Sequence, residues 1–432
     1  MKVRFVKPLI WTKKVIRHFI VFIAFIVILV IVVKTNIIYL NLVMPLIILI
    51  VSVLLYPFEK SIKNYYKKKA MKKWRTYKSL VKVAITGSFG KTSTKNILYS
   101  VLSNKYLTHK TPASFNTIMG LSLDINRQNF NLYDVSILEM GAFRVGEIKE
   151  MVEFALPQIR VITEIGKQHL STFKTIENVI HAKFEMLANL TDEDYIILNV
   201  DNEYIRKQKI HQYQNKHIIT YGINHGLIQA RNINHCDNFM EFDIYKEDNI
   251  LLHVKTHLLS KHNVLNILCV FSVCIALKSY GIEITNKEFE KYISKVEPVD
   301  HRLSISQINN IYLIDDSYSS NVVGFKDAID VLKSFDGIKT IITPGIVDAG
   351  KFEEELNLEI TNSLLNDLDE ICLIENKASK IIEDTLNKKN VTYQKFNNFT
   401  GAYLYLINKY NGIDTNVYIL IENDLPDSFL ER

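Results

Sequence analysis

The residues best suited to chemistry in this 432-residue chain lie in the stretch KVAITGSFGKTSTKNIL, residues 82–98. An apolar run leads into a turn with two glycines, Gly87 and Gly90, and Lys91 and Thr92 follow at once. The sequence after them is compatible with a helix. A strand, a glycine-rich turn and the start of a helix together bind phosphate through backbone N–H groups. The stretch therefore predicts a phosphate-binding loop.

The expected nucleotide contacts are the seven consecutive residues of this loop: Gly87, Ser88, Phe89, Gly90, Lys91, Thr92 and Ser93. A lysine after such a turn neutralises β- and γ-phosphate charge, and the next hydroxyl can ligate Mg²⁺. The glycines are closer together than in G-x-x-x-x-G-K-[ST], which would need a glycine where Ile85 stands. The alternative is an ordinary strand–turn–helix corner.

A second candidate is the carboxylate of Glu139, which ends the apolar run that begins at Val135. We expect this run to be a strand that ends beside the phosphate loop. A carboxylate there is suited to Mg²⁺, which prefers oxygen ligands.

The elements that must position these residues alternate between short apolar runs and amphipathic stretches of helical length. This alternation is typical of an α/β fold with a mostly parallel sheet. A segment from Ile218 to about Leu258 predicts an antiparallel flap, and a helix is expected over His262–Tyr280. The expected strands of the first series are Val81–Thr86, Val135–Glu139, Val161–Glu164 and Tyr195–Asn199.

A second regular series follows an expected hinge at Glu297–Asp300 and predicts a Rossmann-like domain. Its expected strands are Ile311–Ile314, Lys339–Thr343, Glu370–Ile374, Val391–Phe396 and Val417–Ile421.

The N-terminal region holds two apolar runs, Phe19–Val33 and Ile37–Tyr56, the second long enough to span a bilayer. Basic residues flank the pair on both sides, whereas only Lys34 lies between the runs. The pattern predicts a transmembrane helical hairpin in the cytoplasmic (inner) membrane, with both ends and the catalytic domains facing the cytoplasm. A cleaved signal peptide is the competing interpretation, but no small-residue cleavage site follows the first run.

The net charge of +6 comes largely from these flanks. We interpret them as topology signals that contact anionic membrane lipid, and expect no nucleic-acid partner. The four cysteines form no C-x-x-C pair, which is consistent with reduced thiols and disfavours a structural zinc site.

The tight spacing T-G-x-x-G-K-T resembles the ATP loop of the Mur ligase superfamily, and further motifs follow in that family's order. The closest branch is the MurF type, which adds D-alanyl-D-alanine to a muramyl tripeptide. The resemblance covers roughly residues 79–432. Its central motifs are TPASFNTIMGLSLDI (111–125), ILEMGAFRVGEI (137–148), VITEIGKQHLSTF (161–173), NVIHAKFEML (178–187) and KHNVLNIL (261–268). Its later motifs are DHRLSI (300–305), IDDSYSSN (314–321) and ITPGIVDAG (342–350).

The resemblance implies ATP and two Mg²⁺ ions, with Thr92, Glu139, His169 and Lys183 at the metals. It implies that Lys183 is carbamylated, which turns a cation into an anion that bridges toward the second metal. An unmodified lysine paired with Glu185 or another acid is the alternative. The residues implied in catalysis are Lys91, Lys183, His169 and Asn116.

The resemblance also implies nucleotide contacts outside the loop. Asn263 and Asn266 match positions near the adenine, and Arg302 and Asp316 match residues that contact the γ-phosphate and the ribose. Two asparagines that merely cap neighbouring loops are the alternative for the first pair.

The expected organisation has four parts: a membrane anchor (1–57), a basic juxtamembrane segment (58–78), a central P-loop ATP-binding Mur ligase domain (79–297) and a C-terminal Rossmann-like ligase domain (298–432). MurF-type ligases normally begin with a soluble domain for the UDP-linked substrate, and here an anchor stands in that place. In the C-terminal domain the family's D-D-x-Y-N-x-N-P motif appears as residues 315–322, DDSYSSNV, without its first asparagine and its proline.

The function implied is an ATP-dependent ligase that forms an amide through an acyl phosphate. We expect it to join an amino acid, dipeptide or small amine to a carboxylate-bearing glycan or peptide precursor, in peptidoglycan, cell-wall or capsule polysaccharide assembly, with membrane-bound enzymes as further partners. The alternatives are a poly-γ-glutamate-type synthetase and a membrane-bound P-loop ATPase that drives a partner.

Overall fold

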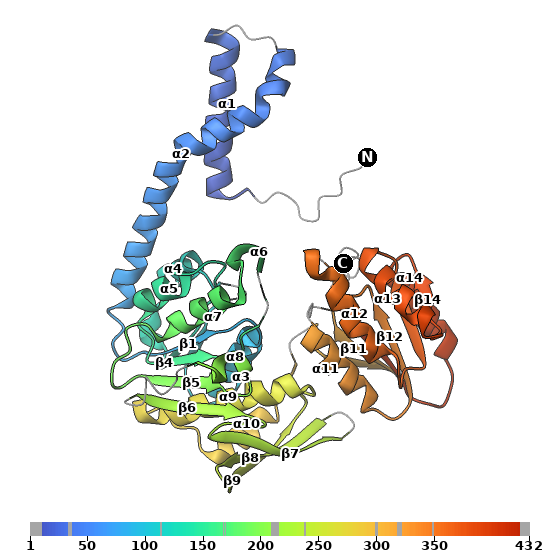
Figure 1. The fold of residues 1–432 in the computed structure, drawn as a ribbon. Coiled ribbons are helices and arrows are strands. Elements are labelled where there is room, and N and C mark those ends of the chain that lie inside the picture. Colours follow the sequence, from blue (N-terminus) through green and yellow to red (C-terminus); the bar gives the residue numbers. More distant parts are fainter. Residues whose placement is uncertain are drawn as a thin grey trace. The chain divides into compact units, whose positions relative to one another are not determined.

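The computed structural model describes residues 11–32, 37–112, 115–166, 168, 170–208, 216–236, 239–298, 301–317, 322–347 and 350–423. The chain divides into two compact units, residues 1–77 with 118–128, and residues 78–117 with 129–432 (Figure 1). Each unit is described by itself.

The first unit is helical. It contains α1 (Lys13–Val32), α2 (Ile37–Trp74) and α4 (Ile118–Arg127). In the hairpin, Ile47 and Val51 of α2 are buried against apolar residues of α1 that include Phe22 and Phe25. Helix α2 continues through the basic segment to Trp74, although Pro45 and Pro57 lie inside it. Proline removes a helix hydrogen bond and kinks the chain, and α2 changes direction along its length in Figure 1.

Within the described part of the chain, three helices are long and apolar enough to cross a membrane by length and composition: Lys13–Ile31, Met44–Trp74 and Lys261–Tyr280. The third differs from the others because 67% of its apolar window is buried, against 0% and 17%. It is mostly α9 (Lys261–Leu277), whose side chains belong to the core of the second unit. Burial against protein therefore accounts for its apolar composition.

The second unit contains a nine-stranded sheet in the order β2-β3-β1-β4-β5-β6-β7-β8-β9. Its pairs are parallel from β2 to β7 and antiparallel from β7 to β9. The strands are β1 (Val81–Thr86), β2 (Thr108–Lys110), β3 (Val135–Glu139), β4 (Ile159–Ile162), β5 (Tyr195–Asn199), β6 (His217–Gly222), β7 (Ile228–Cys236), β8 (Phe239–Lys246) and β9 (Asn249–Thr256). The expected antiparallel flap is confirmed, as a continuation of the parallel sheet.

The helices of this part are α3 (Lys91–Leu102), α5 (Glu147–Ala155), α6 (Leu170–Phe173), α7 (Ile176–Phe184), α8 (Glu203–Arg206), α9 and α10 (Asn286–Ile293). Those from α3 to α8 lie between parallel strands, as βαβ units require, whereas α9 and α10 follow β9. Helix α9 packs against α3 and against β4 to β7.

The unit also contains a six-stranded sheet in the order β10-β11-β15-β12-β13-β14, antiparallel only between β10 and β11. Its strands are β10 (Ser304–Ile308), β11 (Ile311–Asp316), β12 (Ile338–Thr343), β13 (Glu370–Ile374), β14 (Gln394–Phe396) and β15 (Val417–Glu422). Its helices are α11 (Val322–Lys333), α12 (Glu353–Leu364), α13 (Lys377–Lys388) and α14 (Phe399–Tyr410). The α/β class expected from the sequence is confirmed. Of the expected hinge, Val299 and Asp300 lie outside the described residues.

Candidate nucleotide and metal site

The phosphate loop connects the carboxyl end of β1 to the first turn of α3. Gly90 is the residue before α3 and has a left-handed backbone, with φ +78°. A Cβ at this position would lie 2.9 Å from Oδ1 of Asn266. Only glycine adopts this conformation and fits this space without strain. The loop therefore needs its second glycine for both conformation and room.

The loop is held from one side by the segment after β4. The Thr163 hydroxyl donates a hydrogen bond of 2.6 Å to the carbonyl of Phe89, and the Ser88 backbone N–H donates one of 2.5 Å to the carbonyl of Glu164. A Cβ on Gly87 would lie 2.1 Å from Oγ1 of Thr163. These contacts explain why β4 ends at Ile162 instead of Glu164: the following residues leave the sheet to support the loop.

The Lys91 ammonium folds back over this loop. Its Nζ donates hydrogen bonds of 2.7 and 2.9 Å to the carbonyls of Gly87 and Ser88. Burial lowers the pKa of Lys91 to about 8, opposed by the nearby carboxylate of Glu139 and reinforced by the positive charge of Arg302. A cation with such limited solvation is well placed to bind an anionic phosphate.

The first turn of α3 faces Glu139 at the end of β3. The Thr92 hydroxyl lies 3.2 and 3.1 Å from the two carboxylate oxygens, and Nδ2 of Asn116 lies 3.4 Å from Oε1. Lys95, which the sequence reasoning missed, forms an ion pair of 2.9 Å with Oε2. Both side chains of that pair are almost fully buried. The sequence does contain a sign that Lys95 belongs to the site. Lys95 follows Lys91 by four positions, and residues four apart lie on the same face of a helix.

The oxygen atoms of Thr92 and Glu139 fit a magnesium ion. A hydroxyl and a carboxylate that already lie within hydrogen-bonding distance can hold one hard cation between them. Lys95 engages Oε2 of the carboxylate and fixes its orientation. Among the described residues there is no cluster of three or more His, Cys, Asp or Glu side chains that could hold a metal.

Lys183 lies in the last turn of α7 and is buried, with 3% exposure. Burial, reinforced by the charge of Lys91 and opposed by the carboxylates of Glu147 and Glu185, lowers its pKa to about 7. The Glu185 carboxylate accepts hydrogen bonds of 2.6 and 3.1 Å from the backbone N–H groups of Gly146 and Lys149. Glu185 thus caps the start of α5, and the described residues include no ion pair with Lys183. His169 lies outside the described residues.

The two asparagines of α9 lie against the loop. Asn266 accepts a hydrogen bond of 3.0 Å from the Thr94 hydroxyl and donates one of 3.3 Å to Oδ1 of Asn263. The backbone N–H of Asn263 is capped by the Ser260 hydroxyl at 3.2 Å. The structure therefore joins α9 to α3 through this pair.

The two predicted nucleotide contacts in the C-terminal part of the chain, Arg302 and Asp316, lie in different places. Nη1 of Arg302 donates a hydrogen bond of 3.3 Å to the Ser93 hydroxyl, so this cation lies at the first turn of α3. Asp316 ends β11, is buried, and accepts a hydrogen bond of 3.2 Å from the Leu303 backbone N–H. Its neighbour on β15 is Glu422, a fully buried carboxyl whose pKa is raised by burial and by the proximity of Asp316. The described contacts do not bring Asp316 to the phosphate loop.

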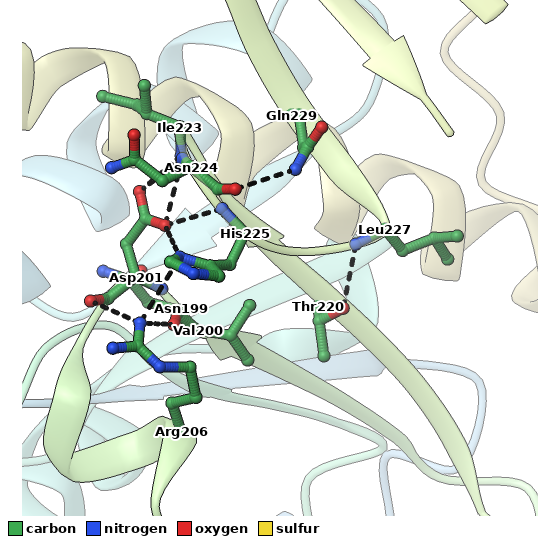
Figure 2. A network of polar contacts seen from close by, with 10 residues as sticks. All are labelled: Asn199, Val200, Asp201, Arg206, Thr220, Ile223, Asn224, His225, Leu227 and Gln229. Carbon is green, nitrogen blue, oxygen red and sulfur yellow. Dashed lines mark hydrogen bonds and ion pairs between the residues drawn. The ribbon is translucent and has the colours of Figure 1, made fainter. Parts of the chain in front are cut away.

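The carboxylate of Asp201 fixes a loop close to the segment after β4 that supports the phosphate loop. Asp201, after β5, accepts hydrogen bonds from the backbone N–H groups of Ile223, Asn224 and His225 (Figure 2). The neighbouring Asn202 donates a hydrogen bond of 2.9 Å to the carbonyl of Ile165, in the segment that supports the phosphate loop. Asp201 therefore positions the backbone of this loop, and the geometry gives it no part in catalysis.

The chain is similar to known proteins in sequence and in fold. A family model described as the Mur ligase middle domain matches residues 85–274. The UDP-N-acetylmuramoyl-tripeptide–D-alanyl-D-alanine ligase of Bacillus subtilis is 29% identical over 281 residues, which are 64% of this chain. The match spans only 58% of that relative's length.

Two solved structures share the fold. A MurF crystal structure from Acinetobacter baumannii gives a TM-score of 0.74 at 20% identity, covering 85% of this chain and 79% of that one. The MurF ligase of Thermotoga maritima in complex with ADP gives 0.73 at 23% identity, covering 85% and 82%.

Proposed function

Because this chain belongs to the Mur ligase superfamily and is similar to its MurF-type members, we propose that it is an ATP-dependent ligase that joins a carboxylate to an amine. The observation that carries the proposal is the gathering of three cations, one buried and two half-buried, at the phosphate loop, helix α3 and Glu139. Lys91, Lys95 and Arg302 all contact the loop, helix α3 or Glu139. Such an excess of positive charge in a desolvated place favours a polyphosphate.

The division of labour in the site supports this chemistry. The loop amides and Lys91 bind the phosphates, and Arg302 approaches from the segment before β10. Thr92 and Glu139 would hold Mg²⁺, which supplies charge neutralisation to the phosphates. A substrate carboxylate attacks the γ-phosphate and releases ADP; an amine then displaces phosphate from the acyl phosphate and loses a proton. These residues position the substrates and neutralise the phosphate charge, and none of them needs to form a covalent bond.

We assign Lys183 a carbamate as part of the same proposal. A buried lysine with a pKa of about 7 is largely neutral at pH 7.5 and above, and only the neutral amine attacks CO₂. The neutral amine and CO₂ form an N–C bond and release one proton, which gives a carbamate anion. Since Glu185 is occupied at the start of α5, it does not compete for this lysine. His169 and this carbamate together would hold a second Mg²⁺. Asn116 completes the predicted catalytic group, and Asn263, Asn266 and Asp316 stay predicted nucleotide contacts.

The proposed location is the inner face of the cytoplasmic membrane. The apolar stretches of α1 and α2 support two spans, and the basic residues beside them support cytoplasmic ends. An enzyme anchored in this way meets substrates near the bilayer. We therefore propose a cell-wall or surface-polysaccharide precursor as the carboxylate and an amino acid, dipeptide or small amine as the acceptor.

The proposal is tested by phosphate release from Mg-ATP with the full chain in detergent. The assay contains a membrane-precursor extract and pooled amino acids and dipeptides, and each pool is omitted in turn. We expect release that needs both pools and is lost in Lys91→Ala, with mass spectrometry then identifying the amide. Release indifferent to both pools would refute the ligase and favour an ATPase that drives a partner. A product that grows by successive glutamates would instead indicate a poly-γ-glutamate-type synthetase.

A further inference from the structure

The base of the helical hairpin has an unusual charge composition. Residues 1–78 contain 16 of the chain's 52 Lys and Arg residues but only one of its 46 Asp and Glu residues, Glu59. That carboxylate is already neutralised. Nε and Nη2 of Arg17 both donate hydrogen bonds to its Oε1, at 2.9 and 2.8 Å, and tie α1 to α2. The remaining cations around this pair have no acidic side chain of residues 1–78 to balance them.

Two hollows flank the Arg17–Glu59 pair. The first, of about 390 Å³, is lined by Lys14 and His18 of α1 and by Tyr56, Lys60 and Lys63 of α2, together with Ser52 and Glu59. The second, of about 450 Å³, is lined by Lys13, Arg17, Ser61, Ile62, Tyr65 and Tyr66. Both volumes lie within the roughly 300–1,000 Å³ of typical small-molecule sites. Ammonium, hydroxyl and imidazole groups in one hollow are the donors that a phosphate group needs.

The first hollow also continues into an apolar surface. Ser52 and Tyr56 lie on the same stripe of α2 as Ile48 and Leu49, because residues three or four apart share a helix face. Ile48 and Leu49 are both more than half exposed. The stripe thus passes from exposed hydrocarbon to hydroxyls to ammonium groups. A membrane lipid has the same order of chemistry, from acyl chain to phosphate.

We propose that the hollow lined by Lys14, Lys60 and Lys63 binds the phosphate head group of an anionic membrane lipid. The inference rests on the membrane anchoring proposed above, which places these residues where a bilayer meets the cytoplasm. Basic pockets between transmembrane helices on this side are suited to lipid phosphates. The phosphate belongs either to a glycerophospholipid or to a polyisoprenyl phosphate, the chemical class of glycan carriers.

The test measures lipid binding to the full chain in neutral detergent by native mass spectrometry at matched ionic strength. Phosphatidylglycerol, a polyisoprenyl monophosphate and zwitterionic phosphatidylcholine are titrated separately. The hollow variant is Lys14→Gln/Lys60→Gln/Lys63→Gln. The matched control is Lys68→Gln/Lys69→Gln/Lys72→Gln, which removes the same charge from exposed positions of the same basic helix outside both hollows.

We expect saturable binding of at least one anionic lipid, weakened about tenfold or more in the hollow variant and less than twofold in the control. Binding of both anionic lipids identifies phosphate as the shared determinant, and binding of one alone identifies the source. An equal loss in both triple variants, or equal binding of phosphatidylcholine, would overturn the site. Flotation with neutral phosphatidylcholine vesicles tests the anchoring separately, since it needs no anionic head group.

Discussion

Lys95 and Glu139 form an ion pair of 2.9 Å in which the two side chains are 2% and 3% exposed. The pair joins α3 to the end of β3 beneath the phosphate loop. It fixes the carboxylate that also faces the Thr92 hydroxyl, so one lysine orients the proposed metal ligand.

Replacing Lys95 with methionine leaves the Glu139 carboxylate buried without this cation. We expect Lys95→Met to destabilise the unit by about 3–5 kcal/mol, measured as the thermal midpoint of the full chain in detergent. The double variant Lys95→Met/Glu139→Gln should recover most of the loss. Lys105→Met, which breaks the exposed pair with Glu288, is the matched control and should lower the thermal midpoint much less, because solvent screens an exposed pair. Similar losses in both single variants would contradict the orienting role of Lys95.

Alanine at Gly90 tests the geometry of the loop. The left-handed backbone alone costs about 1–2 kcal/mol, and Gly146 has a similarly positive φ of +97° with nothing within 4 Å of an added Cβ. Both Gly90→Ala and Gly146→Ala should therefore lower stability by about this amount. Only Gly90→Ala should weaken ATP binding, measured by calorimetric titration, because its Cβ meets Asn266. Equal ATP affinities in the two variants would show that this contact is unimportant.

The pKa of Lys183 gives stability a pH dependence whose sign follows from proton uptake. The folded pKa is about 7, against 10.5 for an unburied lysine. Between these values the unfolded chain binds the additional proton, so this group makes the folded state more stable as pH rises, by at most about 1.4 kcal/mol per pH unit. Thermal midpoints in CO₂-free buffer from pH 7 to 9 should rise more for the wild type than for Lys183→Met. Parallel profiles would contradict the shifted pKa.

The same pair of proteins tests the carbamate. Wild-type protein at pH 8 with ¹³C-bicarbonate should give a carbamate signal by NMR, and Lys183→Met should lack it. A signal that persists in the variant would place the carbamate elsewhere.

Removing the Asp201 carboxylate leaves three backbone N–H groups without their acceptor. Asp201→Ala should cost about 1–3 kcal/mol in stability, since the N–H of Ile223 is partly buried and loses its acceptor, whereas those of Asn224 and His225 are exposed and can bind water. Asp192→Ala removes the same side chain from an exposed pair with Lys216 and should leave the thermal midpoint nearly unchanged, because solvent screens that pair. Thermal unfolding of both variants checks this, and equal midpoints would refute the supporting role of the network in Figure 2.

Much of the fold was predictable because its strands are short apolar runs bounded by polar turns. Val81–Thr86, Val135–Glu139, Tyr195–Asn199 and Glu370–Ile374 were predicted with the bounds observed. The missed strands, β2 and β10, have too few apolar residues to show a pattern. They form because neighbouring strands offer backbone partners, which sequence periodicity does not reveal.

The sequence by itself predicted the phosphate loop, since Gly87, Gly90, Lys91 and Thr92 lie within six consecutive positions between an apolar run and a helix. It also determined the two apolar helices, because length and composition suffice. Only the tertiary structure decided what surrounds them: that Lys95 neutralises Glu139, that Glu185 caps α5, and that Arg17 joins Glu59. These contacts link residues from 36 to 44 positions apart or separate elements of the fold. Packing alone brings such residues together, and burial then makes their charges strong.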